Sequence, residues 1–111
     1  MSAPHAEQRA TFRGKAVDFV VDVRSKLEYW MGHLDGATCI PVDAIAEELP
    51  SRKDVGPNAH ILLYCASGAR SATAAARLRA LGYRNVTDGG GMRDAAAHYV
   101  TGLPRRWQQW T

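Results

Sequence analysis

Residues 60–81 read HILLYCASGARSATAAARLRAL, and this stretch decides the fold. Residues 60–64 are apolar nearly throughout, which is typical of a strand in the middle of a parallel sheet. Residues 71–81 are mostly strong helix formers, and Gly82 follows them as the expected C-terminal cap. The residues between the two segments are small. A strand, a short loop and a helix in this order predict a βα unit whose loop lies at the carboxyl end of the strand.

The sequence on both sides repeats this alternation of strands and helices. Further strands are expected over residues 17–23, 37–40 and 85–88, and further helices over residues 25–31, 43–49 and 92–99. Asp43 is the expected N-cap of the second helix and Pro50 its terminator, while residues 89–91 predict a glycine turn. The fold class is therefore α/β, with a small parallel sheet flanked by helices on both faces.

The length of 111 residues fits one domain. We expect a loose N-terminal arm over residues 1–14, a domain over residues 15–104 and a C-terminal tail over residues 105–111. The composition, 46% hydrophobic and 23% charged, is that of an ordinary globular protein. The net charge of +3 is modest and its Lys and Arg residues are scattered. No nucleic-acid partner is therefore expected.

Other features of the sequence limit the compartment and the cofactors. No apolar run approaches the ~20 residues of a membrane helix, and the first residues hold no apolar core of a secretory signal. We therefore expect no membrane partner. The two cysteines, Cys39 and Cys65, lie far apart, and no Cys or His spacing suggests a metal site or a cofactor. Two unpaired thiols favour a reducing compartment, so we expect a cytoplasmic protein.

The loop over residues 65–71 is the candidate functional site. Small residues let successive backbone N–H groups turn inward as an anion nest, and the following helix points its positive end at the same place. A thiol at Cys65 should then have a lowered pKa. Arg70 is expected to face the mouth and attract an anion, or alternatively to point outward along the helix. The structural alternative is a buried cysteine followed by an ordinary capped helix.

Several short motifs follow one another in a characteristic order: residues 21–24 (VDVR), 28–29 (EY), 32–37 (GHLDGA) and 40–42 (IPV). They are similar to the pattern DVR…EY…GHIPGA…IP of the rhodanese family, which the chain resembles. Residues 65–71 (CASGARS) match its Cys-x-x-Gly-x-x-Ser loop, and residues 81–83 (LGY) match the end of the helix that follows. Within the family, the phage shock protein E type is the most similar, because it has GGLKDIA where residues 90–96 read GGMRDAA.

This resemblance implies a thiosulfate sulfurtransferase with Cys65 as the catalytic residue. The Cys65 thiolate takes sulfane sulfur from thiosulfate or a related donor and passes it, as a persulfide, to a thiol or cyanide. The substrate-binding residues implied are Ala66, Ser67, Gly68, Ala69, Arg70 and Ser71. The alternative is a persulfide carrier that serves a dedicated sulfur-relay partner protein. Fold-related phosphatases have five residues between Cys and Arg, whereas Cys65 and Arg70 are separated by four, which disfavours phosphate as substrate.

Structural roles are expected for the other conspicuous residues. Cys39 is expected to be a buried thiol, His33 a hydrogen-bonding residue of its turn, and Arg24 the ion-pair partner of Glu28. Trp107 and Trp110 are three residues apart and so share one helical face. They are expected to pack on the domain, with a partner contact as the alternative.

Overall fold

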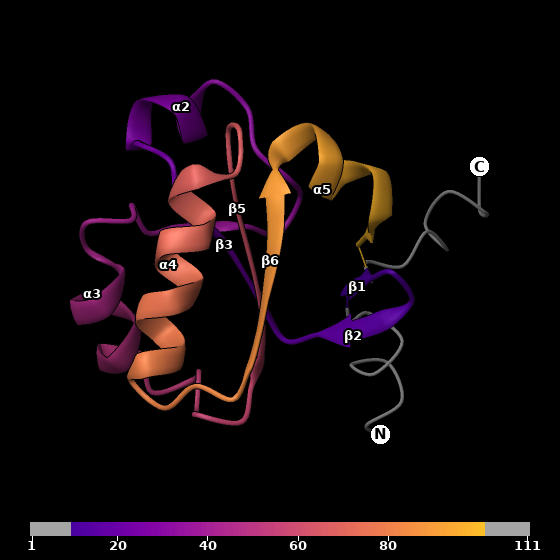
Figure 1. Ribbon diagram of the computed structural model, residues 1–111. Coiled ribbons are helices and arrows are strands. Elements are labelled where there is room, and N and C mark those ends of the chain that lie inside the picture. The colour runs from indigo at the N-terminus through magenta and orange to yellow at the C-terminus, as the bar shows by residue number, and fades with distance from the viewer. Residues whose placement is uncertain (1–9, 102–111) are drawn as a thin grey trace.

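The computed structural model describes residues 10–101, which form two sheets and the helices that cover them (Figure 1). In chain order the elements are β1 (Ala10–Phe12), β2 (Lys15–Val17), β3 (Phe19–Asp22), α2 (Lys26–Trp30), β4 (Thr38–Cys39), α3 (Ile45–Ser51), β5 (His60–Cys65), α4 (Ala69–Ala80), β6 (Asn85–Gly91), α5 (Met92–His98) and β7 (Tyr99–Val100). Within this part of the chain, no helix is long and apolar enough to cross a membrane.

The larger sheet has the strand order β4-β3-β5-β6, and all of its neighbouring strands are parallel. β5 is internal, as its apolar run predicts, and its side chains alternate between two cores. Ile61, Leu63 and Cys65 pack on the face covered by α3 and α4. Leu62 and Tyr64 pack on the opposite face, with residues of α5 and of the smaller sheet. The predicted α/β fold, with helices on both faces of a parallel sheet, is confirmed.

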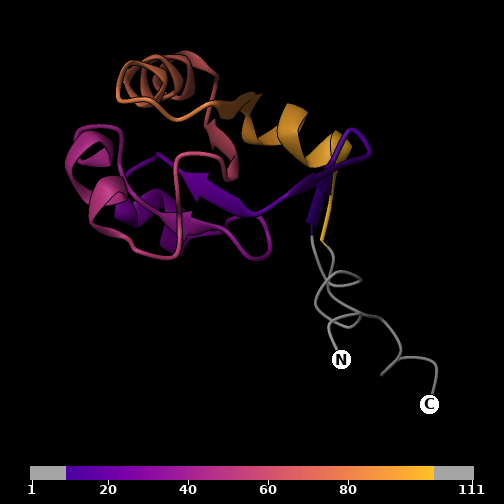
Figure 2. The ribbon, with the colours of Figure 1, turned by 90° about the horizontal axis from the view of Figure 1, so that it is seen from below.

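The smaller sheet, of order β2-β1-β7, is antiparallel and lies at the end of the domain away from α3 (Figures 1 and 2). The expected loose arm over residues 1–14 is therefore wrong for residues 10–14. Phe12 is buried in the core with Val17 and Leu62, which fixes β1 on the domain. Arg13 and Gly14 both have positive φ, as a two-residue hairpin turn requires.

Several element boundaries differ from the sequence-based expectation. α3 begins at Ile45 with Ala44 rather than Asp43 as its N-cap, and Pro50 lies inside its last turn. The fixed φ of proline is helical, so near a helix end Pro50 removes one backbone donor without stopping the helix. α4 begins at Ala69, two residues earlier than expected. The predicted glycine turn is the end of β6, which pairs irregularly with β5. Trp107 and Trp110 lie outside the described residues.

Phe12→Ala should destabilise the domain by about 3 kcal/mol, because it leaves a cavity between the smaller sheet and β5. Lys15→Ala is the matched control, since Lys15 lies in the same sheet with an exposed side chain. It should change the free energy of unfolding by about 0.5 kcal/mol or less. Urea denaturation of both variants measures the difference, and equal stabilities would contradict the assignment of β1 to the core.

Candidate active site

Cys65 is the last residue of β5, and its side chain is fully buried. The exposed residues Ala66 and Ser67 lead from it to Gly68, after which α4 begins. The Cys65 Sγ accepts the backbone N–H of Gly68 at 3.0 Å and that of Ser71 at 3.3 Å. The loop therefore turns backbone donors toward the sulfur, as in an anion nest, and the positive end of α4 reinforces them.

Burial raises the pKa of Cys65, because it disfavours the charged thiolate. Hydrogen bonds act in the opposite direction and outweigh burial. They come from the Ser71 hydroxyl and from the backbone N–H groups of Ser71, Gly68 and Ser67, and the net pKa lies below that of an ordinary cysteine. Thiolate is the nucleophilic form of cysteine, so the surroundings of Cys65 favour reactivity.

Ser71 has a second role beside its backbone donor. Its buried Oγ lies 3.6 Å from the Cys65 Sγ and 3.1 Å from the carbonyl oxygen of Gly68. While Cys65 is a thiol, its S–H can donate to the Ser71 Oγ, and the serine hydroxyl donates to Gly68. After deprotonation, the same hydroxyl can rotate and donate to the thiolate. Ser71 therefore serves both protonation states of the cysteine.

The end of β6 lies directly behind the loop. A Cβ atom at Gly91 would lie 2.7 Å from the carbonyl oxygen of Ala66 and 3.3 Å from the Cα of Ser67. Only glycine leaves room for this approach of the two backbones. Gly68 has a φ of 111°, in the region that favours glycine. The glycines at the end of β6, which the sequence suggested as a turn, therefore set the position of the cysteine loop.

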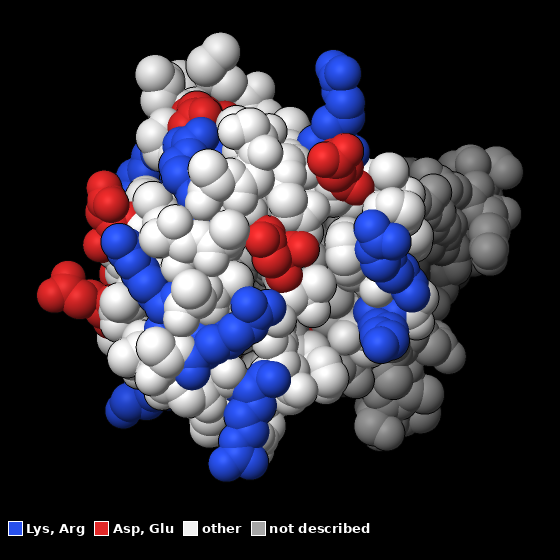
Figure 3. All heavy atoms as spheres, viewed as in Figure 1, with Lys and Arg blue, Asp and Glu red and all other residues white. Residues whose placement is uncertain are grey.

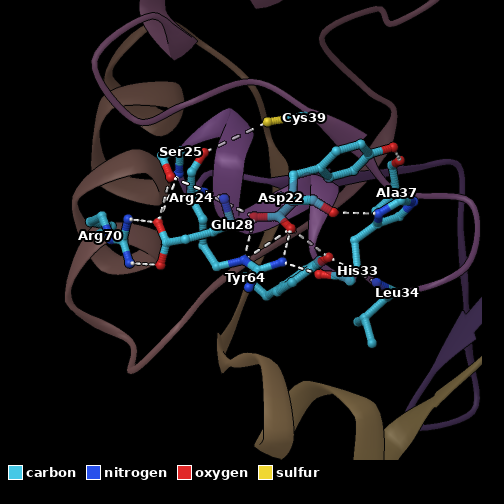
Figure 4. Close-up of polar contacts among 12 residues, drawn as sticks. Asp22, Arg24, Ser25, Glu28, His33, Leu34, Ala37, Cys39, Tyr64 and Arg70 are labelled. Atoms are coloured by element: carbon cyan, nitrogen blue, oxygen red, sulfur yellow. Dashed lines mark hydrogen bonds and ion pairs between the residues drawn. The ribbon is translucent and has the colours of Figure 1, made fainter.

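A buried ion pair occupies the neighbouring strand end (Figure 4). Asp22 accepts hydrogen bonds from Arg24 Nε at 3.0 Å, from Arg24 Nη2 at 2.7 Å and from the Tyr64 hydroxyl at 2.8 Å. The predicted pair between Arg24 and Glu28 is therefore wrong. The buried carboxylate of Asp22 requires a counterion, and the guanidinium of Arg24 provides it. Glu28 contacts other groups. The Tyr64 hydroxyl also accepts the Leu34 N–H at 3.0 Å, and burial raises the pKa of Tyr64.

Arg70 binds Glu28 of α2 through two hydrogen bonds (Figure 4). Its Nη1 lies 2.8 Å from Oε1 and its Nη2 lies 3.1 Å from Oε2. The sequence suggested a side chain that faces the mouth or one directed outward along the helix, and it gave no sign of this pair with Glu28. The hydrogen bond to Glu28 raises the pKa of Arg70, and the charge of Cys65 adds a smaller effect in the same direction.

His33 makes the hydrogen bond expected of it, whereas Cys39 is less buried than expected. The His33 Nδ1 lies 2.8 Å from the carbonyl oxygen of Tyr29, and its ring stacks on the Tyr29 ring. Cys39 is half-buried, and its thiol donates to the carbonyl oxygen of Arg24 at 3.7 Å. Burial raises the pKa of Cys39, opposite to the shift at Cys65. In residues 10–101, no three His, Cys, Asp or Glu side chains are grouped as a metal site.

An exposed apolar surface lies beside the site, and the sequence-based reasoning missed it. Leu27, Trp30 and Met31 are 65%, 83% and 80% exposed, and no residue of α2 is fully buried. Figure 3 shows uncharged surface over α2, next to adjoining acidic and basic side chains. The three residues are spaced i, i+3 and i+4 in the sequence, which indicates one apolar helical face. Such a face is usually buried, so the spacing alone did not reveal an exposed surface.

The chain is similar in sequence to a known protein family and to individual relatives. The family profile described as Rhodanese-like domain matches residues 5–97. A tRNA uridine(34) hydroxylase of Erwinia tasmaniensis is 37% identical over 79% of this chain, and one of Sodalis glossinidius is 35% identical over 78%. The chain spans only 27% and 26% of the length of these relatives.

Solved structures are similar as well. A rhodanese with anions from E. coli has a TM-score of 0.66 and 30% identity, over 75% of this chain and 96% of that protein. The human single-domain sulfurtransferase has a TM-score of 0.56 over 84% of this chain and 82% of its own. Its identity is 23%, so that likeness concerns the fold alone.

The lowered pKa of Cys65 predicts that its thiolate forms below the ~8.5 of a free cysteine as pH rises. Ultraviolet absorbance of the thiolate, measured in Cys39→Ser with Cys39→Ser/Cys65→Ser as blank, gives the midpoint. Ser71→Ala should move the midpoint upward, because the thiolate loses a donor. Thr73→Ala is the control, since its hydroxyl donates to the Ala69 carbonyl oxygen instead. A midpoint at or above the free value would refute the anion nest.

Gly91→Ala should raise the pKa of Cys65, because the new methyl group pushes the Ala66–Ser67 backbone away from its position around the sulfur. Overpacking of this kind should also cost about 1–3 kcal/mol of stability. Gly56→Ala is the matched control, because a Cβ at Gly56 meets no atom within 4 Å. The same thiolate titration measures both variants, and an unchanged midpoint in Gly91→Ala would show that β6 does not hold the loop.

Proposed function

Because the chain belongs to the rhodanese-like domain family, we propose that it is a sulfurtransferase that carries sulfane sulfur as a persulfide on Cys65. The observation that carries the proposal is the convergence of the Gly68 and Ser71 N–H groups on the Cys65 Sγ, at 3.0 and 3.3 Å. These donors favour the thiolate before the reaction. They also suit the persulfide that follows, because both species are anions.

The reaction proceeds in two displacements. The Cys65 thiolate attacks the outer sulfur of thiosulfate or a related donor. A sulfur–sulfur bond forms at Cys65, the donor's own sulfur–sulfur bond breaks, and its electron pair leaves with sulfite. An acceptor thiolate or cyanide then attacks the outer sulfur of the persulfide, and the Cys65 thiolate is regenerated. No general base is required, because the nucleophile is already deprotonated.

The residues of the loop have separate roles in this scheme. The backbone of Ala66, Ser67, Gly68 and Ala69 shapes the nest, Ser71 donates to the sulfur, and Arg70 supplies a cation within the same loop. Both cysteines are free, and we place the protein in the cytoplasm, where thiols stay reduced. Hydroxylation of tRNA uridine is the named activity of relatives about three times as long, so the proposal concerns the chemistry of this domain.

A persulfide carrier for a partner protein is the second candidate function. The apolar surface of Leu27, Trp30 and Met31 favours it, because exposed apolar side chains beside a reactive site are typical of protein docking. An enzyme should turn over cyanide or a small thiol at about 1 s⁻¹ or faster. Complete loading of Cys65 combined with much slower turnover would favour the carrier.

Incubation with thiosulfate should add one sulfur atom to the wild-type protein and to Cys39→Ser, as intact-mass measurement detects. Cys65→Ser should gain none, and its sulfur transfer to cyanide should fall by at least about 1,000-fold, because hydroxyl cannot replace thiolate as nucleophile. The fold should persist, since the two side chains differ little in volume. Sulfur found on Cys39, or substantial activity of Cys65→Ser, would remove Cys65 from the nucleophile role.

A further inference from the structure

Arg70, the cation of the cysteine loop, is already bound by a carboxylate. The Arg70 guanidinium binds both carboxylate oxygens of Glu28, at 2.8 and 3.1 Å. Such a bidentate pair uses two of the N–H donors along the edge of the guanidinium, which would otherwise be available to an incoming anion. Both side chains keep more than a third of their surface exposed, 38% for Arg70 and 36% for Glu28. The pair is therefore accessible to a donor that approaches the loop from solvent.

Glu28 is held in this position from the other side as well. Its Oε1 accepts the backbone N–H of Ser25 at 3.0 Å and the Ser25 hydroxyl at 2.9 Å. The Glu28 N–H in turn contacts the Ser25 Oγ, which completes a capping box at the start of α2. Hydrogen bonds from Arg70 and from the Ser25 N–H lower the pKa of Glu28 to about 2. The carboxylate is therefore ionised and fixed in place at neutral pH.

The pairing with Glu28 weakens the electrostatic attraction between Arg70 and an anionic sulfur donor. An unpaired Arg70 would attract a doubly charged donor twice as strongly as a singly charged one. The Glu28–Arg70 pair has no net charge, and its negative end also faces solvent. Thiosulfate carries two negative charges, so it loses the most from this neutralisation.

We propose that Glu28 determines donor specificity at the Cys65 site by masking Arg70, so that singly charged or neutral sulfane donors are preferred over doubly charged ones. This inference rests on the proposed sulfurtransferase function and names its substrate class. A merely structural pair would join α2 to α4 with no preference among donors of different charge. The dependence on donor charge therefore separates the two roles.

Glu28→Gln tests the proposal, because glutamine keeps the size of the side chain and can still complete a capping box. The two donors are thiosulfate, with two charges, and benzenethiosulfonate, with one. Both transfer an outer sulfur, and they release sulfite and benzenesulfinate respectively. Glu28→Gln should raise kcat/KM about tenfold for thiosulfate and about threefold for benzenethiosulfonate. Both gains should shrink as salt is added.

Two further variants show where the gain comes from. Ser25→Ala removes the capping hydroxyl but leaves the charge of Glu28, so it should alter the ratio of the two kcat/KM values little. In Arg70→Ala there is no guanidinium for Glu28 to neutralise. Adding Glu28→Gln to Arg70→Ala should therefore raise kcat/KM much less than Glu28→Gln does in the wild-type protein. Thermal unfolding of each variant verifies that the domain remains folded.

The outcomes separate this inference from the proposed function. Equal changes for the two donors, or a fall for thiosulfate in Glu28→Gln, would overturn the role of Glu28, while sulfur loading of Cys65 would still support the sulfurtransferase. A wild-type protein that takes sulfur from neither donor would overturn both proposals. A larger gain for the doubly charged donor, dependent on Arg70, would support the selection by charge.

Discussion

The geometry of the site depends on the ion pair between the buried carboxylate of Asp22 and Arg24. A charge without exposure to water is costly unless it is paired and hydrogen-bonded. Arg24 and Tyr64 satisfy that requirement, and Arg24 Nη2 also donates to the carbonyl oxygen of Gly32 at 2.6 Å. Tyr64 directly precedes Cys65 in β5. Arg24 directly precedes Ser25, the N-cap of α2. One ion pair therefore fixes the end of the strand that holds the cysteine and the start of the helix that holds Glu28.

Different groups stabilise the two anions of the site, the Cys65 thiolate and the Glu28 carboxylate. The Cys65 thiolate relies mainly on backbone N–H groups and the Ser71 hydroxyl, all within its own loop. The Glu28 carboxylate relies on Arg70 and on the N-cap of α2. Because backbone dipoles already favour the thiolate, the cysteine does not need Arg70 as a counterion. Arg70 can be paired without loss of the nucleophile, which is why donor selection and nucleophilicity can be assigned to separate residues.

The central βα unit could be predicted from sequence because its signals are local: an apolar run in β5, small loop residues and a strong helix in α4. The nest around Cys65 follows from the same residues. The partners of Arg24 and Glu28 could not be predicted in this way. A pair of Arg24 with Glu28 was expected, whereas Arg24 lies before the helix and its side chain turns back to Asp22. β1 was missed although it forms a local hairpin with β2, and its second partner, β7, lies far along the chain. The role of Gly91 depends on contact with Ala66, again a tertiary feature.

α2 shows how polar contacts position an element that has little core of its own. A helix of five residues is not stable in isolation, and none of its residues is fully buried. It is held by the Ser25–Glu28 capping box, by the Tyr29 hydroxyl, which donates to the Ala37 carbonyl oxygen at 2.7 Å, and by the Glu28–Arg70 pair. These contacts use one side of the helix and leave Leu27, Trp30 and Met31 exposed. The exposed apolar surface and the masked cation are therefore two consequences of the same placement of α2 beside the cysteine loop.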